Sequence, residues 1–213
     1  MPPVPAHDDL LIAAQRAAVV QTAARWLLHE LRTPLQAVTL LSDIVAQSDP
    51  DLLDPTLLGP LAEGGRRLAG DIEQLDRLLR ALPLEREPGP VALVDAARQV
   101  AALLACRRGA RPTALDDALG ALPAVSGVEE VVVHLALTMA LWAVEGPREA
   151  DGAVRIGGSV DGDAVALLVT GPADPAATSD ETGRRAAALL AGRYGGTVAP
   201  GNGGMVLRLR RWS

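Results

Sequence analysis

His29 is the residue of this sequence best placed to do chemistry. Several polar residues lie within a helical turn of it or of one another, so a helix would gather them on one face: Arg25, Arg32, Thr33 and Gln36. A histidine on such a face is in contact with solvent, and an imidazole can exchange a proton or attack an electrophile near neutral pH. The spacing therefore predicts a histidine that a reaction partner can reach.

A long amphipathic helix must position His29. Apolar residues recur at steps of three or four through this segment and predict one buried stripe, made of Leu27, Leu31, Leu35, Val38, Leu41 and Val45. His29 lies off that stripe. Pro34 removes a backbone donor, so we expect it to weaken or kink the helix about one turn after the histidine.

The seven residues from His29 to Leu35 read His-Glu-Leu-Arg-Thr-Pro-Leu. This run closely resembles the H-box of the histidine kinase and histidine phosphotransferase superfamily. The resemblance implies that this helix is the first of a helical hairpin, that two hairpins pair into a dimeric four-helix bundle, and that His29 carries a phosphoryl group. The alternative is an ordinary solvated histidine beside unrelated surface charges.

Composition narrows the class of protein. The chain has 213 residues, a net charge of −6 and no long basic run, so nucleic acid and anionic membranes are poor partners. No apolar run approaches the roughly 18–20 residues that span a bilayer. The single Cys106 excludes an internal disulfide and is expected to be a small core residue. We therefore expect a cytoplasmic protein. Its core is expected to consist of Leu, Val and Ala, since aromatic residues make up only 2% of the sequence.

The first half predicts a helical hairpin. A first helix is expected over 7–47 and a second over about 55–82, joined by the turn residues of 48–55. Gly64 and Gly65 weaken the second helix and can permit close helix approach. Two such helices leave apolar surface uncovered, so we expect the hairpin to dimerise.

A Pro-rich linker over 84–90 is expected to separate a hairpin domain, 1–83, from a second domain, 91–213. Helices and strands alternate in that second domain. The expected helices lie over 91–106, 127–144 and 181–194, and short strands are expected within 112–126. Further strands are expected over 154–160, 164–170, 197–199 and 205–209, and the turn Asp161-Gly162-Asp163 predicts that the first two of these form a hairpin. The fold class is therefore α+β: an antiparallel helical hairpin followed by an α/β sandwich with helices on one face of a mixed sheet.

In element order and spacing, the second half resembles the Bergerat-type ATP-binding domain of histidine kinases. In that family one helix bears asparagines that face the nucleotide, and one of them binds magnesium. Segment 131–143 corresponds to that helix and places Ala136 and Ala140 at those positions, where alanine cannot hold a metal or a phosphate. Thr170 or Gly171 stands where the family has an aspartate that recognises adenine.

The phosphate-binding glycines and the mobile lid of that family are also reduced. Only about a dozen residues separate Gly171 from Gly183, which is too few for a full lid. Gly183 and the pair at 195–196 remain at the family spacing, but the entry and exit of a helix explain them as well. The resemblance therefore implies an ATP-binding fold whose nucleotide site is degenerate.

The resemblance assigns roles to the residues of the hairpin. His29 is the phosphoacceptor, and Glu30 accepts a hydrogen bond from the other ring nitrogen and holds the tautomer. Arg32 compensates phosphate charge or is only a solvated basic residue. Thr33 lies one turn beyond His29, where family kinases can orient a water for dephosphorylation of the receiver. The receiver supplies its own Mg²⁺, so we expect no metal or cofactor in this chain.

The other histidines are weaker candidates. His7 falls at the start of the first helix, and His134 lies on an apolar helix where a buried core histidine is expected. No spacing of His, Cys and carboxylate residues suggests a metal site.

The expected function is that of a histidine phosphotransferase in a two-component phosphorelay, without ATP-dependent autophosphorylation. The expected partners are response-regulator receiver domains, one of them on a hybrid histidine kinase, and a second copy of this chain. No sensor domain is expected, so the input would come from another protein. Two alternatives stay open: an active sensor-less histidine kinase with an atypical ATP site, and a non-catalytic pseudokinase that binds and regulates a kinase or a receiver.

Overall fold

A computed structural model describes residues 7–47, 56, 58–80, 86–107, 113–144, 153–172, 180–201 and 203–213. The elements, in chain order, are α1 (His7–Gln47), α2 (Leu58–Arg80), β1 (Gly89–Val91), α3 (Leu93–Ala105), β2 (Ala114–Leu115), the 3-10 helix η3 (Asp117–Ala121), β3 (Val125–Gly127), α4 (Glu129–Val144), β4 (Arg155–Asp161), β5 (Ala164–Thr170), α6 (Glu181–Arg193), β6 (Thr197–Gly201) and β7 (Gly204–Arg210). The predicted turn at 48–55 and the first residues of the predicted linker lie outside the described residues.

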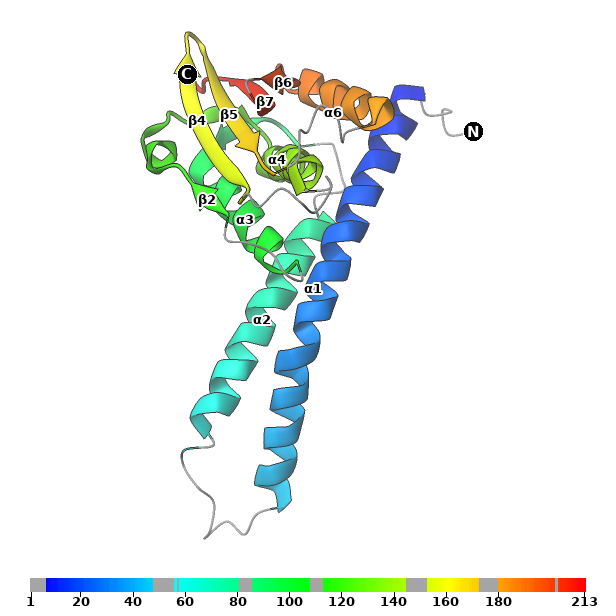
Figure 1. Cartoon of the computed structure of the whole chain (residues 1–213), viewed down its shortest axis with the longest axis vertical. Helices are drawn as coiled ribbons and strands as arrows, with labels where there is room; N and C mark the ends of the chain where they lie inside the picture. Colours follow the sequence, from blue (N-terminus) through cyan, green and yellow to red (C-terminus); the bar gives the residue numbers. More distant parts are fainter. Residues whose placement is uncertain are drawn as a thin grey trace.

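Helices α1 and α2 lie side by side as the predicted hairpin (Figure 1). Helix α1 has 41 residues and continues through Pro34 without interruption. Gly64 lets the two helices approach, because a Cβ at this position would lie 3.0 Å from the Cγ2 of Val38. A Cβ at Gly65 would meet open space. Of the two glycines that were expected to permit close helix approach, Gly64 therefore does so and Gly65 does not.

The second half is the predicted mixed sheet with helices on one face. Its five strands run in the order β2-β4-β5-β7-β6, and only the β2–β4 pair is parallel. Strands β4 and β5 form the predicted hairpin through a two-residue loop, where Gly162 adopts a φ of +61° that suits glycine. Helices α3, α4 and α6 lie against this sheet (Figure 1).

A second sheet of two strands lies beside the first. Strand β1 pairs antiparallel with β3, and a single bridge between Val125 and Arg211 connects β3 to the end of the larger sheet. Gly89 and Pro90, which the sequence places in the linker, are therefore part of β1.

Helix α4 is the centre of the core. All of its residues from Val131 to Ala143 are buried, including the polar side chains of His134 and Thr138. One side of α4 contacts β5 and β7, while other sides contact α1, α3 and α6. A helix that is apolar all round is stable only when it is covered on every side, so α4 needs more than the sheet to bury it.

The first half of α1 supplies part of that cover. Its buried apolar residues belong to the same hydrophobic cluster as α4, and they are Ile12, Val19, Val20, Ala23 and Leu27. The predicted stripe continues less completely beyond Leu27. Leu35 is 51% exposed, whereas Pro34 is buried. Helix α1 therefore belongs to the sheet domain over its first half and to the hairpin over its second. None of the described helices is both long and apolar enough to cross a bilayer.

Candidate functional site

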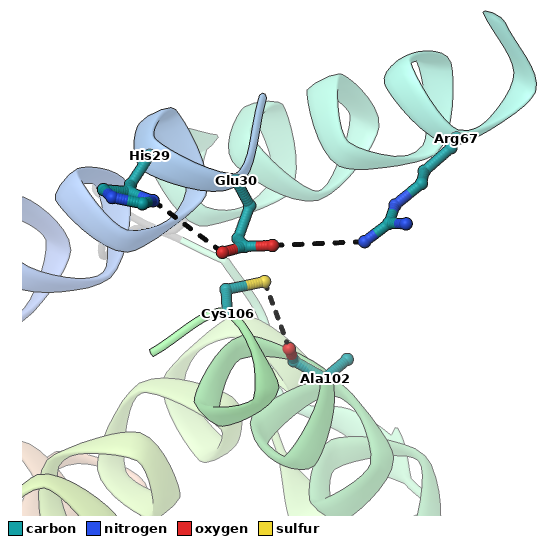
Figure 2. Close-up of polar contacts among 5 residues, drawn as sticks. All are labelled: His29, Glu30, Arg67, Ala102 and Cys106. Atoms are coloured by element: carbon teal, nitrogen blue, oxygen red, sulfur yellow. Dashed lines mark hydrogen bonds and ion pairs between the residues drawn. The ribbon is translucent and has the colours of Figure 1, made fainter. Parts of the chain in front are cut away.

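His29 lies on the second half of α1, and its side chain is 59% exposed. Figure 2 shows its ring turned toward the neighbouring Glu30, with Nδ1 3.8 Å from the Oε1 of that carboxylate. This distance is longer than a hydrogen bond and within the range of an ion pair. Because Nδ1 faces the carboxylate, the other ring nitrogen, Nε2, lies on the far side of the ring. The structure thus places His29 on an accessible surface, as its helical position predicts.

Glu30 lies between two nitrogen groups from different helices. Its second carboxylate oxygen, Oε2, is 4.0 Å from the Nη2 of Arg67 on α2, as Figure 2 shows. The sequence analysis did not identify Arg67, because nothing in the sequence gives the register of α2 against α1.

Cys106 brings the sheet domain to this site. It follows α3, is half-buried, and its Sγ donates a weak hydrogen bond to the carbonyl oxygen of Ala102 at 3.4 Å (Figure 2). Burial raises the pKa of the Cys106 thiol, and the charges of Asp71 and Glu30 raise it further. The thiol is therefore neutral and unreactive, at the edge of the core that was its predicted place.

Arg32 and Thr33 follow His29 within about one turn of α1, and both side chains are exposed. They occupy the same face of the helix as His29. Glu30, which the structure places near His29, is less exposed than the histidine. The accessible surface of the hairpin around His29 therefore carries all four residues that the sequence assigned to phosphotransfer.

The positions assigned to the nucleotide lie in a different environment. Ala136 and Ala140 are fully buried within α4. The polar side chains of this stretch, His134 and Thr138, are also buried, and the Thr138 Oγ1 donates a hydrogen bond to the His134 carbonyl at 2.8 Å. His134 is thus the core histidine that its apolar surroundings predict.

Arg16 of α1 is buried beside His134. Its Nε and Nη2 atoms have no hydrogen-bond partner within the described part of the chain. Burial lowers the pKa of His134 to about 3, and the charge of Arg16 lowers it further, so the imidazole is neutral. Burial also lowers the pKa of Arg16. Two buried guanidinium nitrogens without a hydrogen-bond partner cost free energy, so Arg16 reduces the stability that the surrounding apolar packing provides.

Gly183 lies in the first turn of α6, where α1 covers it. The side chain of Asp180 accepts a hydrogen bond from the Gly183 N–H and caps the helix. A Cβ at Gly183 would lie 3.3 Å from the Oε1 of Gln15 and 3.4 Å from the Cζ2 of Trp142. The helix end that could bind a phosphate is therefore capped by its own aspartate and packed against α1 and α4.

The end of β5 is equally crowded. Thr170 is half-buried and pairs with Arg155 on one side and Gly204 on the other. A Cβ at Gly171 would lie 2.5 Å from the carbonyl oxygen of Ala143, so this glycine serves a close approach between β5 and α4. Asp174, a few residues later, lies outside the described residues.

Ion pairs attach the first turn of α1 to α6. Asp8 lies 3.4 Å from the Nη2 of Arg185, and Asp9 pairs with Arg193.

No group of three His, Cys, Asp or Glu side chains able to hold a metal ion occurs among the residues that the structure describes.

No protein-family model and no curated protein matches the sequence. Solved structures that resemble the chain are histidine kinases. The Acinetobacter baumannii histidine kinase AdeS is 16% identical, with a TM-score of 0.47, over 87% of this chain and 98% of the other. A histidine kinase from Burkholderia phymatum is 17% identical, with a TM-score of 0.42, over 92% and 96%. The histidine kinase ThkA, solved in complex with the response regulator protein TrrA, is 15% identical, with a TM-score of 0.43, over 93% and 63%. At this level of similarity the comparison concerns only the arrangement of helices and strands, a helical hairpin followed by a sheet domain. The function of this chain has to be inferred from its own residues.

Proposed function

We propose that this chain is a histidine phosphotransferase of a two-component phosphorelay, which exchanges a phosphoryl group between His29 and an aspartate of a receiver domain. The observation that carries the proposal is a contrast within one chain. The imidazole of His29 is accessible and faces a carboxylate, whereas the helix face assigned to a nucleotide is buried. Chemistry at the histidine is therefore available without a nucleotide bound to the same chain.

The proposed reaction is an in-line displacement at phosphorus. The lone pair of His29 Nε2 attacks the phosphorus of the receiver's acyl phosphate, so that a nitrogen–phosphorus bond forms. The bond between phosphorus and the aspartate oxygen breaks, and the carboxylate leaves with the electron pair. The proton on Nδ1 stays on the ring, which becomes positively charged. The reverse reaction returns the phosphoryl group to a receiver.

Glu30 is the residue best placed to stabilise that charge. Its Oε1 already lies 3.8 Å from Nδ1, and a small side-chain movement would convert this contact into a charged hydrogen bond. Arg32, exposed within one turn, can approach the phosphoryl oxygens, and Thr33 can orient a water that attacks a phosphorylated receiver. The Mg²⁺ that neutralises the phosphate belongs to the receiver in this proposal, so no metal is assigned to this chain.

The surroundings of α4 favour a protein that does not use ATP. Ala136 and Ala140 offer no donor to a phosphate and no ligand to a metal. The first half of α1 packs across the helix layer, where Gln15 lies near Gly183 and Arg16 near His134. A nucleotide between α4 and α6 would have to displace this helix and expose its buried apolar residues to water, which costs free energy.

The surface of the hairpin favours a dimer. Four large apolar side chains on the second half of α1 and on the described part of α2 are more than half exposed in the single chain: Leu28, Leu35, Leu40 and Ile72. Soluble proteins seldom leave such side chains together on one long hairpin, and pairing of two hairpins into a four-helix bundle would cover them. A mass measurement by light scattering at micromolar concentration tests this part of the proposal, since a monomer would contradict it.

The cellular setting proposed here is the cytoplasm, where receiver domains and hybrid histidine kinases would meet the hairpin. Residues 1–83 form the phosphotransfer domain in this proposal and residues 91–213 the degenerate ATPase-fold domain. The first half of α1 connects the two.

A panel of phosphorylated receiver domains tests the function. The wild type and the His29→Ala variant are incubated with each labelled receiver, and the label on the chain is measured after separation. Transfer to the wild type alone is the expected result. Tight binding of a receiver with no label on the wild type would instead favour a pseudokinase that binds and regulates without passing phosphate.

A further inference from the structure

Arg67 is a residue outside the H-box that contacts the H-box across the hairpin. It lies on α2, and its guanidinium reaches the Glu30 carboxylate of α1 at 4.0 Å (Figure 2). The same carboxylate faces His29 with its other oxygen at 3.8 Å. Its two oxygens therefore have different partners: the imidazole on one side and the guanidinium on the other.

Helix geometry alone does not direct Glu30 toward His29. Neighbouring residues on an α-helix point about 100° apart, so their side chains do not face each other unless something turns one of them. A cation on the facing helix can turn the Glu30 side chain. It attracts one carboxylate oxygen and so selects the side-chain rotamer that presents the other oxygen to Nδ1.

The close approach of the two helices makes this reach possible. Gly64 packs against Val38 and lies one turn before Arg67 on the same side of α2. The neighbouring Arg66 takes a different direction, because its Nη2 pairs with Glu63 of its own helix at 2.8 Å. Two adjacent arginines of similar exposure thus have different partners: Arg66 pairs within α2, and Arg67 pairs with the H-box.

The thiol on the other side of Glu30 leaves Arg67 as its cationic partner. Cys106 lies on the sheet-domain side as a neutral thiol, and its Sγ donates a hydrogen bond to the carbonyl oxygen of Ala102. The thiol therefore brings no positive charge to the carboxylate. Arg67 is the basic residue that the structure pairs with Glu30.

We infer that Arg67 is a positioning residue of the phosphotransfer site: it holds the Glu30 carboxylate beside Nδ1 of His29, which favours the tautomer with its proton on Nδ1 and its lone pair on Nε2. The inference depends on the proposed function for its consequence in phosphotransfer, but its effect on the imidazole is a property of the isolated chain. Exposed ion pairs of this type are worth at most about 1 kcal/mol, so loss of Arg67 should change the tautomer ratio and the transfer rate by no more than about fivefold.

The direct test is the tautomer of His29 in wild type, Arg67→Gln, Arg67→Lys and the matched control Arg66→Gln, measured from the ring-nitrogen chemical shifts by heteronuclear NMR. The His29→Ala variant identifies the resonances. Wild type and Arg66→Gln should share a population rich in the Nδ1–H form. Arg67→Gln should move toward the Nε2–H form that free histidine prefers, and Arg67→Lys should recover part of the difference. Equal populations in wild type and Arg67→Gln would overturn the inference.

Transfer from a labelled receiver is the second readout. Arg67→Gln should transfer about threefold to fivefold more slowly than wild type, while Arg66→Gln should transfer at the wild-type rate. The two readouts separate two failures. A tautomer shift without transfer from any receiver would contradict the proposed function and leave Arg67 as a positioning residue. Normal transfer with unchanged tautomers would contradict the role of Arg67 alone.

Discussion

The two halves of α1 have opposite surroundings. Over the first half, side chains such as Ile12, Val20 and Leu27 are buried against the helices of the sheet domain. Over the second half, α2 covers only one side, and His29, Arg32 and Thr33 remain exposed (Figure 1). One continuous helix thus joins a face that packs on the sheet domain to an open face that carries His29.

The difference shows how the packing of one helix determines which of its side chains a partner can reach. The apolar helix α4 needs cover on the side away from the sheet, and α1 provides it with residues that each contribute about 1.5–3 kcal/mol on burial. This packing stabilises the sheet domain and closes its helix layer. His29 remains 59% exposed, although the end of α3 in the sheet domain lies near its neighbour Glu30.

The largest effect is expected at the open half. His29→Ala removes the imidazole of the H-box, so labelling of the chain by phosphorylated receivers should be abolished. The stability should be unchanged because the side chain is largely exposed. A melting curve measured beside the transfer assay checks both statements. Residual labelling of a well-folded variant would show that another residue accepts the phosphoryl group.

Adjacent leucines compare the two environments directly. Leu27→Ala should lower the free energy of unfolding by about 2–5 kcal/mol, because this side chain is fully buried in the shared core. Leu28→Ala should change it by no more than about 0.5 kcal/mol in the monomer, since Leu28 is 57% exposed. Denaturant titration measures the two values at a protein concentration where light scattering shows a monomer. Equal effects in the monomer would mean that Leu27 is not packed as described.

The buried cation of the covered half offers a stabilising substitution. Arg16→Met removes a buried guanidinium whose Nε and Nη2 have no hydrogen-bond partner in the described part of the chain. It keeps most of the apolar volume, so the free energy of unfolding should rise by about 1–4 kcal/mol. Arg25→Met, on the polar face with His29, is the matched control and should have little effect. A large loss of stability in Arg16→Met would indicate that the guanidinium has a stabilising partner.

The pH dependence of stability reports on His134, which lies near Arg16 in the covered half. The pKa of His134 is about 3 in the folded chain and about 6.5 when exposed, so unfolding allows the ring to take up a proton. Its contribution to stability is complete above pH 6.5 and is lost as the pH falls toward 3. At pH 5 the loss is about 2 kcal/mol. His134→Leu should remove this part of the pH dependence, and an unchanged profile would contradict the burial of a neutral imidazole.

Much of this arrangement was predictable from local sequence patterns. The periodicity around His29 predicted a helix over 7–47, which is the extent of α1, and the Asp161-Gly162-Asp163 turn predicted the β4–β5 hairpin. Both depend on residues close together in the chain. The exposure of His29 followed in the same way from its position off the apolar stripe.

Contacts between distant segments could not be predicted. The packing of Ile12 and Arg16 against the sheet domain was missed, although the apolar run 131–143 has no polar face and therefore required a cover. Arg67 was missed because a pairing across a hairpin depends on the register of two helices, which turns and periodicity do not fix. Leu35 was assigned to the buried stripe because periodicity does not distinguish a face that another helix covers from one that stays exposed.

The most direct test of the account is a pair of labelling reactions on the purified chain, with γ-labelled ATP and Mg²⁺ in one and a labelled, phosphorylated receiver domain in the other, each with wild type beside His29→Ala. The open histidine and the covered helix layer predict label from the receiver on the wild type alone and no label from ATP on either protein. Label from ATP on the wild type that disappears in His29→Ala would contradict the account, because α1 would then have to leave the helix layer and admit a nucleotide.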